Sequence, residues 1–212
     1  MATRNNRPLN LHKASSAEIL YCLGGSMDWA SKLLQSAHVY NDFLRSLLEK
    51  QFYRPGPNTS LKFIAQDLHY DIPKITRWIR QIYEDIFLLN EQHPEVFKNE
   101  GIEHFCRFSN YDNHRCFSIW LTHTPRIYET LDLWFVKAEL GTATFMVTDV
   151  SHTLQGNAQI INLTLEGNCR NRYREELVHR AEFEKVLGFM ETLEKSRFEI
   201  DEILFTHYSK LR

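Results

Sequence analysis

Apolar residues recur at helical spacing through the first ninety residues, most regularly from Ser60 to Ile86. Ile64, Ala65 and Leu68 share one face of a short helix, and a second apolar stripe follows at the 3.6-residue period. The members of that stripe are Ile75, Trp78, Ile79, Ile82 and Ile86. The pattern predicts two amphipathic helices joined by a tight turn, the second of them covering about residues 72–89.

Residues around the turn suit this pair of helices. Asp71 is placed to cap the second helix, and Pro73 in its first turn loses only an amide that would be unpaired anyway. Ala65 is small enough for two helices to cross closely. An earlier apolar pattern predicts a preceding helix over Tyr40 to Phe52, so the segment reads as a unit of three helices.

This segment resembles the helix-turn-helix of bacterial transcription regulators over about residues 40–90. The positions that match are Ala65, Leu68, Ile75 and Trp78. Many such motifs carry glycine at the start of the turn, where this chain has His69, a residue that tolerates left-handed backbone better than a β-branched one does. The resemblance implies a DNA-binding domain whose second helix enters the major groove.

The outward surface of this unit supplies the candidate DNA contacts. They are Lys62, Lys74, Thr76, Arg77, Arg80 and Gln81. The two arginines can bind guanine or phosphate and the glutamine can read adenine, whereas the lysines and the threonine suit the phosphate backbone. Glu84 lies on the same face of the second helix and would repel phosphate unless it sits beyond the groove.

The distribution of charge gives this interpretation modest support. The formal net charge is −2, but residues 1–90 hold 11 basic and 8 acidic residues, and residues 91–212 hold 14 and 19. The positive excess therefore lies in the half that contains the motif. Because the excess is small for phosphate binding, either the basic residues cluster on one face or a dimer presents them twice.

Beyond Asn90 the pattern changes to short strand-like runs separated by turn residues. Strands are predicted near residues 103–109, 115–123, 131–139, 143–151 and 158–166. The connections are too short for crossover helices, so the sheet is expected to be largely antiparallel. Helical patterns return at about residues 172–193 and 199–210.

These elements predict an α+β protein with two domains. A flexible arm covers residues 1–14, a helical domain with the helix-turn-helix covers 15–90, and residues 102–212 form an antiparallel sheet with C-terminal helices. The segment between them, with Pro94 and Gly101, reads as a linker. We expect the second domain to serve dimerisation or to sense a small-molecule effector.

Composition indicates a reduced cytoplasmic setting. Four cysteines in 212 residues are too few for a disulfide scaffold. No apolar run reaches the roughly 18–20 residues needed to cross a membrane, and the N-terminus lacks the apolar core of a signal peptide. The expected location is the cytoplasm, with no membrane partner.

One cluster contains residue types that bind zinc. His104 and Cys106 are followed by His114 and Cys116, and a hairpin centred on Asn110 would bring all four onto one face. However, neighbours on one face of a strand lie roughly 6.5–7 Å apart, which is too far for four ligands to converge on one metal. Buried cysteines beside surface histidines are the favoured interpretation, so no cofactor is predicted.

No motif for a nucleophile elbow, a phosphate-binding loop or a zinc protease occurs in the sequence. We therefore expect no enzymatic activity, although an active site assembled from distant residues leaves no such motif. The leading hypothesis is a bacterial-type transcription regulator that binds double-stranded DNA as a homodimer. The alternatives are a protein-interaction or ligand-binding module that docks through its helical unit, and an enzyme built on the sheet.

Overall fold

The computed structural model describes residues 14–54, 60–111, 113–156, 158–167 and 172–208. Its contacts divide the chain into two compact units, Met1–Asn168 and Cys169–Arg212. The fold is α+β, as the sequence predicted. The expected N-terminal arm, residues 1–14, lies outside the described residues except for Ala14. No described helix is both long and apolar enough to cross a membrane.

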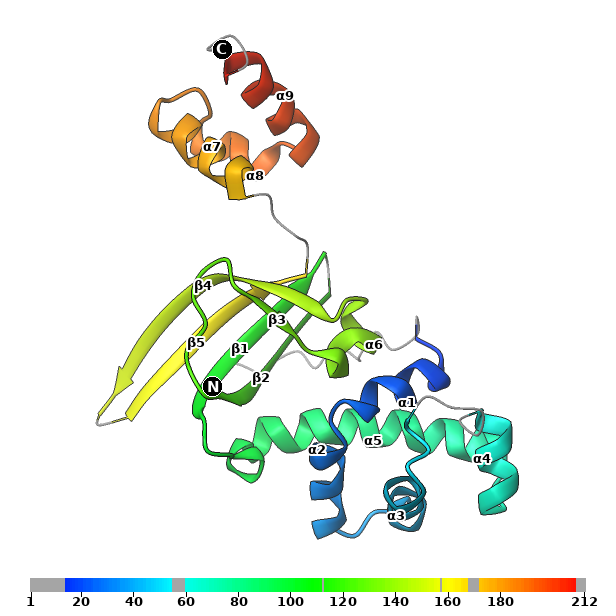
Figure 1. Cartoon of the computed structure of the whole chain (residues 1–212). Helices are drawn as coiled ribbons and strands as arrows, with labels where there is room; N and C mark the ends of the chain where they lie inside the picture. The colour runs from blue at the N-terminus through cyan, green and yellow to red at the C-terminus, as the bar shows by residue number, and fades with distance from the viewer. Residues whose placement is uncertain (1–13, 55–59, 112, 157, 168–171, 209–212) are drawn as a thin grey trace. The chain divides into compact units, whose positions relative to one another are not determined.

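The N-terminal unit begins with short helices that pack around one long helix, α5 (Figure 1). The elements are α1 (Ser16–Gly24), α2 (Met27–Lys32), η1 (Leu33–Gln35), α3 (Asn41–Lys50), α4 (Leu61–Leu68), α5 (Ile72–Gln92) and η2 (Pro94–Phe97). Helix α1 begins after Ser15, whose hydroxyl accepts a hydrogen bond from the backbone N–H of Glu18 at 3.2 Å. Every helix predicted in this part of the chain is present.

A five-stranded sheet follows the helices. Its strands are β1 (Ile102–Asn110), β2 (Asn113–Leu121), β3 (Thr130–Asp132), β4 (Thr144–Gln155) and β5 (Ala158–Glu166), in the order β2-β1-β5-β4-β3. Three neighbouring pairs are antiparallel, but β1 and β5 run parallel. The sheet is therefore mixed, because the long chain segment between β1 and β5 allows them to point the same way.

The predicted strand over residues 131–139 is wrong beyond Asp132. The chain instead forms the 3₁₀-helix η3 (Trp134–Val136) and the short helix α6 (Lys137–Leu140). Within η3, Phe135 is fully buried against aromatic rings of α2 and α5. Tertiary packing of this ring overrides the alternating pattern that suggested a strand.

The helices and the sheet share one hydrophobic core, so the domain boundary expected between residues 90 and 102 is not found. Cys106 and Phe108 of β1 and Phe117 of β2 face the C-terminal half of α5, where the rings of Phe87 and Phe117 lie 5.4 Å apart. In Figure 1, α5 runs from the turn after α4 to the edge of the sheet. The chain divides instead after Asn168.

In its described residues, the C-terminal unit contains the helices α7 (Arg172–Phe183), α8 (Phe189–Glu194) and α9 (Arg197–Tyr208). The single helix predicted over residues 172–193 is interrupted, because Lys185 adopts a positive φ of 59° and Gly188 takes the N-cap position of α8. The unit has its own small core, made by Ala181, Leu187, Ile200 and Leu204.

Candidate nucleic-acid interface

A helix, a three-residue turn and a second helix are present where the sequence predicted them. Helix α4 begins at Ser60, whose hydroxyl accepts a hydrogen bond from the backbone N–H of Phe63 at 3.1 Å. At the end of α4, His69 adopts the left-handed conformation with φ 54°, and its backbone N–H donates to the Ala65 carbonyl. Asp71 takes the N-cap position of α5, but its side chain makes no capping hydrogen bond.

The predicted apolar stripes are buried. Ile64, Ala65, Ile75, Trp78, Ile79, Ile82 and Ile86 are buried, and Leu68 is half-buried. The ring of Trp78 lies 5.5 Å from that of Phe43 on α3 and 5.0 Å from that of Tyr70 in the turn. Helices α3, α4 and α5 therefore pack as the three-helix unit that the sequence indicated.

The turn can be tested at His69. His69→Gly is expected to raise the free energy of unfolding by about 1 kcal/mol, because glycine adopts left-handed backbone without steric cost. His69→Val is expected to lower it by a similar amount, because β-branched residues are strained there. Urea unfolding followed by tryptophan fluorescence measures both changes, and equal stabilities would contradict the turn geometry.

The six candidate contact residues differ in their exposure to solvent. Lys62, Lys74 and Arg77 are exposed, whereas Thr76, Arg80 and Gln81 are half-buried. Arg77 lies in the second turn of α5 and is the exposed arginine of this set. Of the three candidates expected to read bases, Arg77 is exposed, whereas Arg80 and Gln81 are half-buried.

Two of the candidates also hold the fold together. The guanidinium of Arg80 donates to the carbonyl of Ala14 at 2.8 Å and so anchors the chain before α1. The ammonium of Lys74 lies over the rings of Trp78 and Tyr70, 4.7 Å and 5.1 Å from their centroids. Both side chains therefore have intramolecular contacts that a role in DNA binding would have to keep or replace.

Acidic residues follow the candidate contacts along α5. Glu84 is exposed, as expected from the helical period. Asp85 accepts a hydrogen bond from the Tyr40 hydroxyl at 2.6 Å and lies 3.9 Å from Nδ1 of His38. Because negative charge repels phosphate, a phosphate-binding surface on α5 would have to lie within its first three turns.

The four zinc candidates lie on opposite faces of the sheet, which contradicts the hairpin that would have grouped them. Cys106 pairs with Phe117, three residues away from the partner, His114, that a turn centred on Asn110 would give. A change of strand register by an odd number of residues turns side chains to the other face of the sheet. Because the register differs by three residues from the expected one, Cys116 and His114 point away from Cys106. Among the described residues, no group of three or more potential metal ligands comes together.

His104 is a core residue and not the surface histidine expected from the sequence. Its Nδ1 lies 2.8 Å from the carbonyl oxygen of Ile102 and its Nε2 lies 2.9 Å from the hydroxyl of Thr124. Burial lowers the pKa of His104. A neutral ring that donates to the carbonyl and accepts from the hydroxyl satisfies both contacts.

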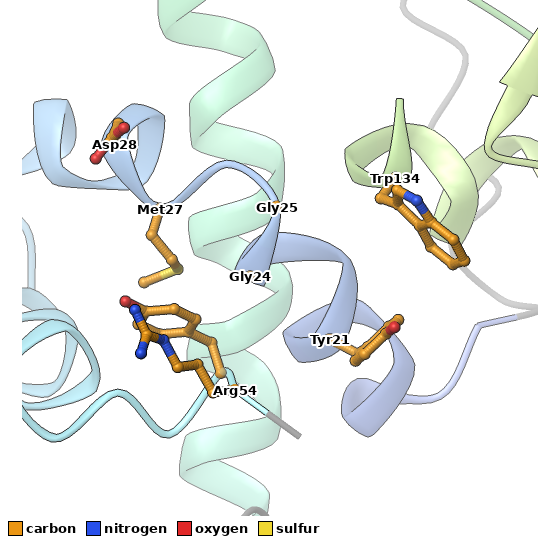
Figure 2. Close-up of a pocket in the computed structure, with 8 residues that line it drawn as sticks. Tyr21, Gly24, Gly25, Met27, Asp28, Arg54 and Trp134 are labelled. Atoms are coloured by element: carbon orange, nitrogen blue, oxygen red, sulfur yellow. The ribbon is translucent and has the colours of Figure 1, made fainter. Parts of the chain in front are cut away.

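The structure also contains a groove that the sequence did not reveal, with a volume of about 430 Å³. Figure 2 shows Tyr21 and Trp134 on one side of it and Met27 and Arg54 on the other, with the backbone of Gly24 and Gly25 between them. The rings of Tyr21 and Trp134 meet edge to face with centroids 5.9 Å apart. No local pattern could indicate this groove, because its walls come from segments far apart in the sequence.

A buried carboxylate was missed for the same reason. Glu139 on α6 is 9% exposed, and its Oε1 lies 3.7 Å from Nη1 of Arg115 on β2. Its Oε2 has no hydrogen-bond partner among the described residues. The guanidinium of Arg115 also stacks 4.1 Å from the ring centroid of Phe87. Burial raises the pKa of Glu139 to about 7.

The chain is an α+β protein whose longest described helix, α5, has the exposed basic residues Lys74 and Arg77 in its first two turns. No protein-family model, curated protein or solved structure matches the chain.

Proposed function

We propose that the protein binds double-stranded DNA through the first turns of α5 and acts as a transcription regulator. The observation that carries this proposal is the exposed Arg77, presented on α5 directly after a short helix and a tight turn. The exposed Lys74 adds positive charge in the first turn of α5, and the exposed Lys62 lies in the first turn of α4. The N-terminus of a helix also carries partial positive charge, which favours phosphate.

Each candidate residue has a role that its chemistry allows. Arg77 would read guanine or clasp phosphate, and Gln81 would read adenine. Lys62, Lys74 and Thr76 would position the phosphate backbone. Arg80, whose guanidinium donates to the Ala14 carbonyl, would add positive charge beside the phosphate backbone.

Arg77→Ala is expected to weaken binding to a selected DNA site by roughly 5- to 150-fold, which corresponds to about 1–3 kcal/mol. Selection from a random duplex library at low salt would identify the site. A salt titration of the wild-type protein should show affinity falling steeply as salt rises. Arg107→Ala is the matched control, because Arg107 is an exposed arginine on the far face of the sheet and should change affinity less than twofold.

Absence of wild-type binding to the random library at low salt would contradict the proposal. Equal losses from Arg77→Ala and Arg107→Ala would contradict the placement of the DNA on α5.

The groove in Figure 2 favours a second candidate function, a ligand-binding module. Its aromatic walls and its one basic and one acidic side chain, Arg54 and Asp28, suit a small polar molecule.

A further inference from the structure

The C-terminal unit exposes more large apolar side chains than it buries. Among the described residues, seven of them are each at least 58% exposed, namely Tyr173, Phe183, Phe189, Met190, Leu193, Phe198 and Phe205. Its described buried core consists of Ala181, Leu187, Ile200 and Leu204, of which one is an alanine. Exposed apolar residues concentrated in this way mark an interaction surface.

The exposed side chains form faces on two helices. Phe189 and Leu193 lie four residues apart on α8, and that helix contributes no buried residue. Phe198 and Phe205 lie seven residues apart on α9 and share a face, while Ile200 and Leu204 of the same helix point into the core of the unit. A helix that is apolar on both sides is normally covered on both sides.

We propose that α8 and α9 pack against the same helices of a second copy of the chain, forming a two-fold symmetric dimer. This inference goes beyond DNA binding and does not depend on it. A two-fold contact joins the same surface on both partners, so a self-complementary apolar face is enough to form it.

The exposed area fits a second copy. Phe189, Phe198 and Phe205 of α8 and α9 are 70–74% exposed, and a buried aromatic side chain covers about 150–250 Å². Together they would contribute about 430 Å², which is about half of the roughly 800 Å² that each partner buries in a standard interface. Met190 and Leu193 extend the same surface.

Charge and size favour the same occupant. Residues 169–212 hold nine basic and nine acidic residues, so two copies of the unit would not repel each other. A unit of this length is close to the size below which one hydrophobic core seldom suffices and oligomerisation is usual. Pairing would give each small unit a second layer of buried apolar side chains.

The experiment is sedimentation velocity on the full chain without DNA, across the micromolar concentration range. The wild-type protein should sediment with twice the mass of the 25.2 kDa chain. A double variant, Phe198→Glu with Phe205→Glu, should weaken association at least 100-fold and sediment as a monomer. The matched control is Val39→Glu with Leu154→Glu, because these residues are 79% and 75% exposed in the N-terminal unit. This control should remain dimeric.

A wild-type protein that is monomeric throughout would overturn the proposal, and it is also the result expected if another part of the same chain covers α8 and α9. A dimer that survives the Phe198 and Phe205 changes would overturn it as well, because the contact would then lie elsewhere. If circular dichroism shows that the glutamate variant loses helix, Phe198→Gln with Phe205→Gln gives the same test without added charge. Because DNA is absent, failure here is distinct from failure of the DNA-binding proposal.

Discussion

Replacing Asn90 with aspartate is expected to lower the free energy of unfolding of the N-terminal unit by about 3–5 kcal/mol. Asn90 is 2% exposed near the end of α5. Its Nδ2 donates to the carbonyl of Ser118 and its Oδ1 accepts from the backbone N–H of Ser118, both at 2.9 Å. The aspartate would bury a charge and place an oxygen against the carbonyl oxygen.

This contact matters because Ser118 lies on β2, which is at the edge of the sheet. Unpaired backbone groups on an edge strand invite pairing with other chains. Asn90 pairs with both the backbone N–H and the carbonyl of Ser118, as a neighbouring strand would. Asn90→Leu should therefore also destabilise the fold, by about 2–4 kcal/mol, because it leaves a buried N–H and a buried carbonyl unpaired.

The two variants should differ in their response to pH. A buried carboxyl group has a raised pKa in the folded state, so the aspartate variant should regain stability as the pH falls and the protonated group donates to Ser118. The leucine variant should keep a constant deficit relative to wild type. Urea unfolding followed by tryptophan fluorescence isolates this unit, because Trp29, Trp78, Trp120 and Trp134 all precede residue 169.

The matched control for Asn90 is Asn162→Asp. Asn162 is half-buried on the opposite face of the sheet, where its Nδ2 donates to the Thr153 hydroxyl at 3.2 Å. This change should cost less than about 1.5 kcal/mol, because the Thr153 hydroxyl can donate to the aspartate instead. Equal losses at Asn90 and Asn162 would contradict a special role for Asn90 at the sheet edge.

The α4–α5 segment could be predicted from sequence because its determinants are local. The 3.6-residue spacing of Ile75, Ile79 and Ile82 fixes the buried face of α5 whatever packs against it. The same reasoning placed Arg77 on the exposed side. It could not show that Arg80 would bind the carbonyl of Ala14, because that contact joins residues 66 positions apart.

The register of the sheet could not be predicted for a related reason. The turn between β1 and β2 pairs Asn110 with Asn113 instead of being centred on Asn110, and this change alone moves Cys116 to the other face. The parallel pairing of β1 with β5 depends on contacts between distant segments. Pro94 and Gly101 look like a linker in the sequence, yet Asn90 and Phe87 join α5 to β2 across it.

The N-terminal unit is also expected to lose stability as the pH rises from about 4.5 to 7, by roughly 3 kcal/mol through Glu139 alone. Burial is the main cause that raises the pKa of this carboxyl from 4.5 to about 7; Arg115 opposes the shift and Glu84 adds to it. Because the folded state binds the proton more tightly than the unfolded state, protonation stabilises the fold. The stabilisation is complete below pH 4.5 and is lost once the pH exceeds 7.

Glu139→Gln isolates this contribution, because glutamine resembles the protonated acid at every pH. The variant should match the wild type near pH 4.5 and exceed it by roughly 3 kcal/mol at pH 8. Glu103→Gln is the control, since Glu103 is exposed on the far face of the sheet, and its difference from the wild type should not change with pH. Urea unfolding monitored by tryptophan fluorescence at several pH values gives both differences.

Parallel pH profiles for the wild type and Glu139→Gln would mean that Glu139 keeps its ordinary pKa in the folded protein. That result would require water or movement of α6 to solvate the Oε2 atom that has no partner among the described residues. Diverging profiles would mean that the fold tolerates a buried charge at neutral pH beside Arg115. A buried carboxyl group whose pKa lies near neutral pH lowers the stability of the fold. Strongly shifted pKa values of this kind cluster at functional sites.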